Sequence, residues 1–393
     1  MKLKPRRRRQ LRLSLECLES RLNLSTFAEP VSLLSVGGVL DVTLRAHESS
    51  QVIEVGNPSN PTAPGVPTLV DGFLTYAWTV HTGIASNGQT TGDGSIGPTL
   101  RVNPGDVLRI RLVNDLEDVT PVTQAGGDQP TNLHTHGLII SPAGNSDNVL
   151  LNVPAGYTND YEFQIPLDQE PGVNWYHPHR HGFVADQVYR GLMGFLVVGS
   201  ADNDIDQVRN LPTRLMVIQA QTIVNDPSTG RPTLAPLGTS ASGALQLTVN
   251  GQYMPELQME AETEVWVGLQ IDPRDLVRTF IPDPSVPPSQ WNMDAPSNQP
   301  TFYVAQDGSA FPMTVEKARV ALAPGKRVSE VVAAPPGGQE RTFVGAAITP
   351  TAVPVPYYQP LIKIKGFGQG GDPAAWQNLP LTSPTMQYEN LSL

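Results

Sequence analysis

The sequence predicts an all-β fold, because short apolar stretches alternate with turn-forming residues along most of its 393 residues. Its 38 Pro and 35 Gly favour turns and argue against a long helical bundle. Charged residues make up only 16% of the chain and hydrophobic residues 39%, which is too apolar for wholesale disorder. Many short strands with Pro and Gly corners are typical of β-sandwiches and barrels, and this length accommodates two such domains.

The clearest single strand follows the turn at residues 103–106. Residues 107–113 read Val-Leu-Arg-Ile-Arg-Leu-Val, in which Leu108, Ile110 and Leu112 alternate with the other side chains, as expected for a half-buried strand. Further strands are predicted at residues 161–165, 173–176, 192–198, 214–220, 245–249, 264–271, 301–304, 319–322, 330–333 and 361–365.

The chain divides near residue 200, where the polar stretch 199–204 follows an apolar strand. Both halves carry a Pro-Gly turn that leads into a strand, at residues 103–107 and 323–328, which indicates two related β-domains. We therefore expect a basic prefix over residues 1–26, a first domain over 27–200 and a second over 201–393.

The prefix carries eight basic and two acidic side chains in its first 25 residues. It lacks the continuous apolar core of an ordinary signal peptide. Its residues 15–21, Leu-Glu-Cys-Leu-Glu-Ser-Arg, are similar to the LExLExR prefix on exported proteins of some bacterial lineages. The prefix therefore predicts export from a bacterium to the periplasm, cell surface or medium, with a basic disordered arm or an incorrect start as the alternative.

Charge and cysteine content exclude several classes of protein. The net charge is −11 and the chain beyond the prefix is acidic, which disfavours nucleic-acid binding. The single cysteine, Cys17, lies in the prefix, so the body can form no internal disulfide, iron–sulfur cluster or cysteine–zinc site. No apolar run approaches the roughly 20 residues of a membrane helix.

Five of the seven histidines fall between residues 134 and 181. They include two His-x-His pairs, His134 with His136 and His177 with His179. Residues i and i+2 of a strand share a face, so two neighbouring strands could present four imidazoles to one place. Imidazole suits copper, zinc, iron and nickel, and this spacing does not distinguish copper from zinc. The two histidines nearer the N-terminus, at positions 47 and 81, are interpreted as ordinary surface or hydrogen-bonded residues.

These two motifs, His-Thr-His-Gly at 134–137 and Trp-Tyr-His-Pro-His-Arg-His-Gly at 175–182, resemble the first cupredoxin domain of the multicopper oxidases. Residues 99–106 and 191–198 are similar to that domain's lead-in and closing strand. Residues 249–251, 305–308 and 322–327 are similar to the family's middle domain. The resemblance implies two Greek-key cupredoxin (plastocyanin-like) β-sandwiches over residues 30–390.

The resemblance also implies copper as cofactor and a role for each matched histidine. It places His134 on the type 2 copper, His136 and His177 on one type 3 copper and His179 on the other. It gives His181 no ligand role, so that residue lies near the site at most. Asp147 matches an acidic position that assists proton delivery, although here it stands in Ser-Asp-Asn and not in the more usual Asp-Gly.

The family's remaining ligands belong to a third domain, whose His-Pro-x-x-His-x-His and His-Cys-His segments have no counterpart here. Residues 182–393 contain neither His nor Cys. The resemblance therefore predicts half of a trinuclear copper site. Oxidation of an unknown reductant by dioxygen would also need the third domain, which is expected to be encoded separately or to have been lost by truncation. The alternatives are an exported copper-binding protein without turnover and a degenerate cupredoxin scaffold.

Overall fold

The computed structural model describes residues 26–56, 65–116, 129–237, 244–259, 261–271, 276–283, 285–291, 299–348, 357–366 and 368–383. Residues 1–25 of the predicted prefix, with Cys17, lie outside the described residues. The described chain is almost entirely β-structure and contains one short α-helix, α2 (Val184–Arg190), and two 3-10 turns, η1 (Pro288–Gln290) and η2 (Pro373–Trp376). None of the helices in the described ranges is long and apolar enough to cross a membrane.

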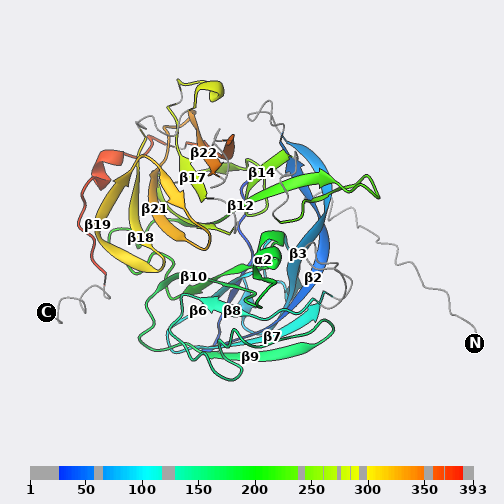
Figure 1. Ribbon diagram of the computed structural model, residues 1–393. Helices are drawn as coiled ribbons and strands as arrows, with labels where there is room; N and C mark the ends of the chain where they lie inside the picture. The colour runs from blue at the N-terminus through cyan, green and yellow to red at the C-terminus, as the bar shows by residue number, and fades with distance from the viewer. Residues whose placement is uncertain are drawn as a thin grey trace, which may run out of the picture.

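The first half of the chain forms two facing layers of strands (Figure 1). One layer is a six-stranded sheet whose last strand, at its edge, carries the first histidine pair. Its strands, in spatial order, are β4 (Ile84–Ala85), β1 (Ser32–Leu34), β6 (Thr99–Val102), β11 (Gly194–Val198), β10 (Gly172–His177) and β8 (His134–His136).

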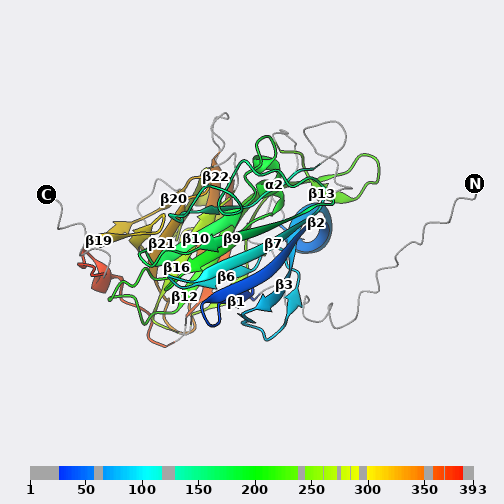
Figure 2. The ribbon, with the colours of Figure 1, turned by 90° about the horizontal axis from the view of Figure 1, so that it is seen from below.

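The second layer of the first half continues into the second half as one twelve-stranded sheet, joined where β13 pairs with β3. Seen from below, its strands cross the molecule from β19 at one end to β3 and β2 at the other (Figure 2). In spatial order the main path is β19 (Ser309–Lys317), β18 (Thr301–Gln306), β21 (Arg327–Ala333), β16 (Thr263–Gln270), β12 (Thr213–Asn225), β13 (Pro232–Leu234), β3 (Val66–Thr82), β2 (Val39–Val55), β7 (Val107–Asp115) and β9 (Thr158–Gln164), with β14 (Ala244–Val249) beside β12 and β5 (Thr91–Gly92) beside β3.

A five-stranded sheet completes the second half. Its strands are β15 (Glu256–Gln258), β23 (Tyr357–Lys365), β22 (Glu340–Ile348), β17 (Leu276–Phe280) and β20 (Val320–Leu322). Buried residues of this sheet, such as Phe343 and Leu361, pack with Trp266 and Val328 of the large sheet into one core. The sequence-based fold class, an all-β protein built from β-sandwiches, is confirmed.

The three largest apolar cores of the described residues hold these layers together. One fills the first sandwich and contains Leu40, Leu108 and Tyr176. Another joins the two halves, because it combines Trp175 of β10 with residues such as Val267 of β16. The six-stranded sheet therefore buries one face inside the first sandwich and the other against the second half. This second face carries the histidines.

The strands predicted from alternation lie within or within two residues of observed strands. Strands that alternation did not predict include β17, β19 and β22 as well as β2 and β3, which are each 17 residues long and whose pairing continues through irregularities such as the one between Ser49 and Gln51. Helix α2 was also not predicted. The strand predicted at 192–198 begins only at Gly194, because the chain first leaves α2 through Gly191, with φ of 120°. The division at residue 200 stays a prediction.

Candidate metal centre

The two histidine pairs meet because strands β8 and β10 are antiparallel neighbours. In their register His177 lies opposite His134 and Trp175 lies opposite His136. Residues directly opposite each other share a face of the sheet, as do residues two apart along one strand. Three imidazoles and one indole therefore form a square array on one face, while Tyr176 points the other way into the first core.

The side chains of this array are close enough to share a metal ion. One ring nitrogen from each of His134, His136 and His177 lies within 4.8 Å of the other two. This is the only such group of three potential ligands in the described ranges. The ring centroids of His134 and His177 are 5.2 Å apart and nearly perpendicular. All three donors are imidazoles, which suits copper or zinc better than calcium or magnesium.

Asp147 orients His134. Its two carboxylate oxygens each lie 3.0 Å from His134 Nδ1, and Oδ1 also accepts the Thr135 N–H at 2.8 Å. Burial opposes ionisation of Asp147, but the hydrogen bonds from His134 and from the Thr135 backbone outweigh it and lower the carboxyl pKa. The ionised carboxylate therefore accepts a hydrogen bond from Nδ1–H, which leaves Nε2 of His134 free to bind a metal.

His177 is held in the same tautomer by a different acceptor. Its Nδ1 donates to the Pro178 carbonyl at 2.8 Å, and its Nε2 is buried without a hydrogen-bond partner among the residues that the structure describes. Burial, followed by the neighbouring His134, keeps the pKa of His177 well below its usual value. A buried, unprotonated nitrogen with nothing to bind costs free energy unless a metal satisfies it. This orphaned atom shows that the array fits a metal ion.

Trp175 supports both histidine pairs, a role that sequence analysis missed. Its ring stacks on His177 at 4.0 Å and on His136 at 5.2 Å between centroids. Burial first, and the guanidinium of Arg327 second, lower the pKa of His136 to about 4. Its imidazole is therefore neutral at neutral pH, as a ligand must be.

The remaining predicted residues lie at the margin of the array. The exposed ring of His179 is 5.1 Å from that of His134, and its backbone N–H donates to Asn132 Oδ1 at 2.6 Å. It lies outside the group of three whose ligand atoms converge. His181 is exposed. The sequence did not indicate the role of Asn132, whose side chain holds the backbone around the histidines in place. Its amide nitrogen donates to two carbonyls of the loop that carries Asp147.

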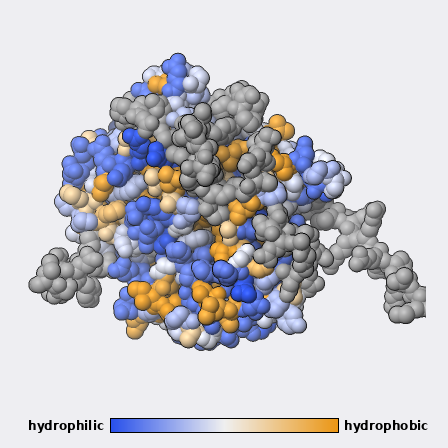
Figure 3. Space-filling view, in the orientation of Figure 1, coloured by the Kyte–Doolittle hydropathy of each residue, from blue (hydrophilic) through white to orange (hydrophobic). Residues whose placement is uncertain are grey.

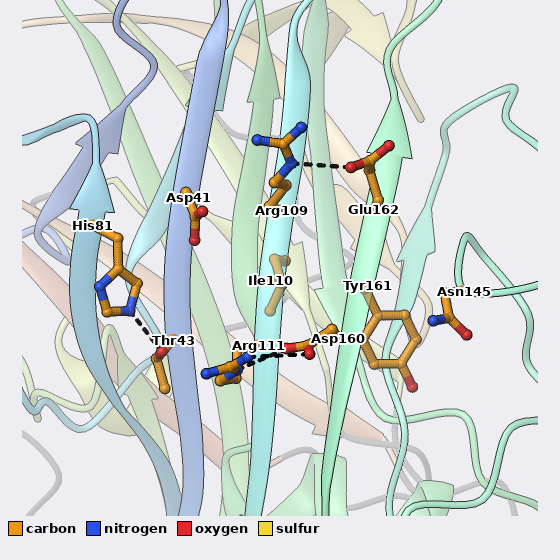
Figure 4. Close-up of a pocket in the computed structure, with 10 residues that line it drawn as sticks. All are labelled: Asp41, Thr43, His81, Arg109, Ile110, Arg111, Asn145, Asp160, Tyr161 and Glu162. Carbon is orange, nitrogen blue, oxygen red and sulfur yellow. Dashed lines mark hydrogen bonds and ion pairs between the residues drawn. The ribbon is translucent and has the colours of Figure 1, made fainter.

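The other two histidines have hydrogen-bonding roles, as expected. His47 Nε2 pairs with Asp93 at 3.1 Å. His81 lies 2.8 Å from the Thr43 hydroxyl, beside a hollow of about 500 Å³ on the outer face of β2, β7 and β9 (Figure 4). The charged side chains of that hollow pair with each other across the strands, Arg109 with Glu162 and Arg111 with Asp160.

Fold and site together define a class of protein: paired β-sandwiches with a partly buried imidazole cluster, suited to a transition metal, where the halves meet. Comparison with known proteins names the class. The sequence profile described as "Multicopper oxidase" matches residues 75–203. A multicopper oxidase of Staphylococcus aureus is 28% identical over 246 residues, which span 60% of this chain and 46% of the relative. The cell division protein FtsP of Sodalis glossinidius is 25% identical over 280 residues, covering 68% and 52% of the two chains.

Solved structures agree on the fold. A multicopper oxidase from Pediococcus acidilactici superimposes with a TM-score of 0.59 at 19% identity, covering 91% of this chain and 62% of that one. A metallo-oxidase from Campylobacter jejuni gives a TM-score of 0.58 at 20% identity, covering 88% and 62%. Residues 75–203 thus match the multicopper oxidase family, whose members use copper as cofactor, and the fold of the chain is similar to that of solved multicopper oxidases. The chain spans about half the length of the curated relatives it matches.

Proposed function

We propose that His134, His136 and His177 bind copper, with His179 as a further ligand, and that this site forms half of a dioxygen-reducing copper centre. The observation that carries the proposal is the convergence of three imidazole nitrogens within 4.8 Å, one of them buried and unpartnered. Bound copper would supply the one-electron redox chemistry of the site. The chain is organised as a first domain over 27–200, which carries the site, and a second over 201–393.

The residues of the chain prepare this site before any metal arrives. Asp147 fixes the tautomer of His134, and the Pro178 carbonyl does the same for His177. Trp175 holds two imidazoles by stacking and excludes water from one side. Asp147 also stands at the acidic position expected to assist proton delivery, a role that we propose it shares with its hydrogen bond to His134.

A complete oxidase centre needs ligands that this sequence does not supply. We propose that a separate polypeptide or further domain provides them and docks beside the histidines. Support comes from exposed apolar side chains on the loop that follows His136, since Ile139 is 77% and Leu150 83% exposed. Apolar side chains also gather on the lower part of the surface in Figure 3, the region that the first half occupies in Figure 1.

Oxygen uptake tests this function. The copper-loaded chain should oxidise a phenol or diamine at no more than trace rates, and addition of a polypeptide carrying the missing His-rich segments should raise the rate at least ten-fold. His181→Ala should keep that gain, whereas His177→Ala should lose it. Robust uptake by the chain alone, or no gain with any such partner, would contradict the proposal of a half-centre.

A second candidate is an exported copper-binding protein without turnover. The observation that favours it is the convergence of three imidazole nitrogens within 4.8 Å, which can hold one copper ion without any further domain. In that case copper should bind with full affinity while the partner polypeptide leaves oxygen uptake unchanged. Localisation outside the cytoplasm belongs to both candidates and rests on the prefix alone.

A further inference from the structure

A buried arginine of the second half reaches the histidine array of the first. The side chain of Arg327, the first residue of β21, is only 4% exposed. Its Nε donates to the Val173 carbonyl of β10 at 3.3 Å, two residues before Trp175. A Cβ on Gly137, the residue after His136, would lie 3.0 Å from Arg327 Nη2. The guanidinium therefore lies beside the His136 end of the array.

The turn that precedes Arg327 packs on the same two rings. A Cβ on Gly325 would lie 3.3 Å from the Trp175 ring and 3.9 Å from Cε1 of His136. Arg327 Nη1 donates to the Gly325 carbonyl at 3.2 Å, which ties the guanidinium to this turn. The second half thus closes one side of the site with a turn and a fixed positive charge.

Within the described ranges, one carboxylate forms an ion pair with that guanidinium and partly balances its charge. Asp307 Oδ1 lies 3.6 Å from Arg327 Nη1, and the Asp307 side chain is 44% exposed, so solvent weakens its effect. Asp307 also accepts the Arg327 backbone N–H at 2.9 Å. At the other end of the array Asp147 faces His134. The three imidazoles therefore lie between a carboxylate of the first half and a guanidinium of the second.

We propose that Arg327 is a positioning residue through which the second half sets the preference of the histidine site for Cu(I) over Cu(II). A buried positive charge repels the doubly charged ion more strongly than the singly charged one. Arg327 therefore lowers Cu(II) affinity relative to Cu(I) affinity, and Asp307 moderates the effect. The inference rests on the proposed copper ligands, and it assigns the second half a part in the site although its residues 201–393 contain no histidine.

The test compares dissociation constants for Cu(I) and Cu(II), measured on the full chain by competition with chelators. Arg327→Gln should raise the ratio of Cu(II) to Cu(I) affinity about ten-fold, equivalent to a fall of about 59 mV in potential for a one-electron couple. Arg327→Lys keeps the charge and should restore most of the ratio. Arg341→Gln is the control, because Arg341 is a half-buried arginine that donates to Ala333 within the second half.

Asp307→Asn makes the proposal falsifiable even where Arg327→Gln folds poorly. Asp307 has φ of 53° in the two-residue turn between β18 and β19, a conformation that Asn adopts well before Gly. Loss of the Asp307 charge should lower the ratio of Cu(II) to Cu(I) affinity two- to three-fold, in the direction opposite to Arg327→Gln. If Arg327 and Asp307 had a purely structural role, both variants would have a lower melting temperature but the wild-type ratio of Cu(II) to Cu(I) affinity. That result would overturn the inference. Absence of copper binding in the wild-type chain would instead reject the proposed function.

Discussion

At the scale of single residues, Asp147 determines which nitrogen of His134 is available to a metal. The motif His-Thr-His-Gly could be recognised in the sequence, but the partner of its first imidazole lies thirteen residues further along in an irregular loop. No periodicity predicts that contact. The family resemblance pointed to Asp147 for proton delivery, whereas the geometry places it first as the acceptor that orients the His134 ring.

Asp147→Asn should weaken Cu(II) binding by about 10- to 100-fold, because an amide accepts the Nδ1 proton less strongly and no longer fixes the tautomer. Competition with a chelator measures the change. Asp160→Asn serves as the matched control, since Asp160 is an exposed carboxylate that pairs with Arg111 on the neighbouring strand. Equal affinities in the two variants would show that Asp147 does not support the site.

A second prediction at this scale concerns the buried carboxyl group of Glu330 and the pH dependence of stability. Glu330 lies in β21 inside the core of the second half, with one carboxyl oxygen lacking any partner in the described ranges, and burial raises its pKa to about 7. A carboxyl with a raised pKa in the folded state stabilises the fold only at low pH. That contribution is complete below the unfolded-state pKa near 4.5 and is lost as pH rises to about 7.

Glu330→Gln should remove this pH dependence. Relative to wild type, the variant should gain up to about 3 kcal/mol in free energy of unfolding between pH 4.5 and pH 8, by about 1.4 kcal/mol per unit of pKa shift. Urea denaturation at the two pH values measures the gain. Glu340→Gln, at a side chain that is 61% exposed, is the control. Parallel stability curves for wild type and Glu330→Gln would contradict the assignment.

At the scale of elements, the two Pro-Gly turns recognised in the sequence adopt the same form. Gly105 and Gly325 have φ of 88° and 76°, and in each turn the fourth residue donates its N–H to the first carbonyl at 3.0 Å. Glycine is favoured because other residues are strained in this region. The turn in the first half leads into β7, whereas the turn in the second leads into β21 and lies beside the rings of Trp175 and His136.

Alanine at each turn separates backbone strain from an effect on the site. Gly105→Ala and Gly325→Ala should each lower the free energy of unfolding by about 1 to 2 kcal/mol, measured by urea denaturation. Only Gly325→Ala should also weaken copper binding, because its new methyl group presses on the Trp175 ring at 3.3 Å. Equal copper affinities in the two variants would show that this turn does not shape the site.

The strands themselves were largely predictable, because their alternation has a period of two and their ends carry Pro and Gly. Their partners were not. The pairing of β8 with β10 brings His134 opposite His177 across 43 residues of chain, and Arg327 comes from 191 residues beyond His136. Register and packing are set by tertiary contacts that local patterns do not encode, so the sequence could suggest the ligands but not the charges around them.

At the scale of the whole molecule, the halves share one core and one continuous sheet. The histidine array lies on the face of the first half that meets the second, which is how a half without histidines could influence the proposed copper site. The sequence predicted two similar halves, but the face on which the histidines lie depends on which side of β10 is buried against β16. That choice could not be determined from alternation alone.

The copper-loaded chain should lack the intense blue absorption of a type 1 site. That band requires a cysteine thiolate on copper, and the only cysteine, Cys17, stands 117 residues before His134 in the basic prefix. A visible absorption spectrum of the copper-saturated chain measures this directly. An intense band near 600 nm, lost in Cys17→Ser, would show that the prefix reaches the site.

Copper binding by the purified chain tests the central claim, that the array on β8 and β10 is a copper site, most directly. Metal analysis after copper loading and gel filtration gives the stoichiometry for wild type, for His134→Ala with His177→Ala, and for His47→Ala with His81→Ala. The array predicts at least one tightly bound copper ion in wild type and in the second double variant, and none in the first. Equal copper content in all three proteins, with the fold retained, would contradict the claim.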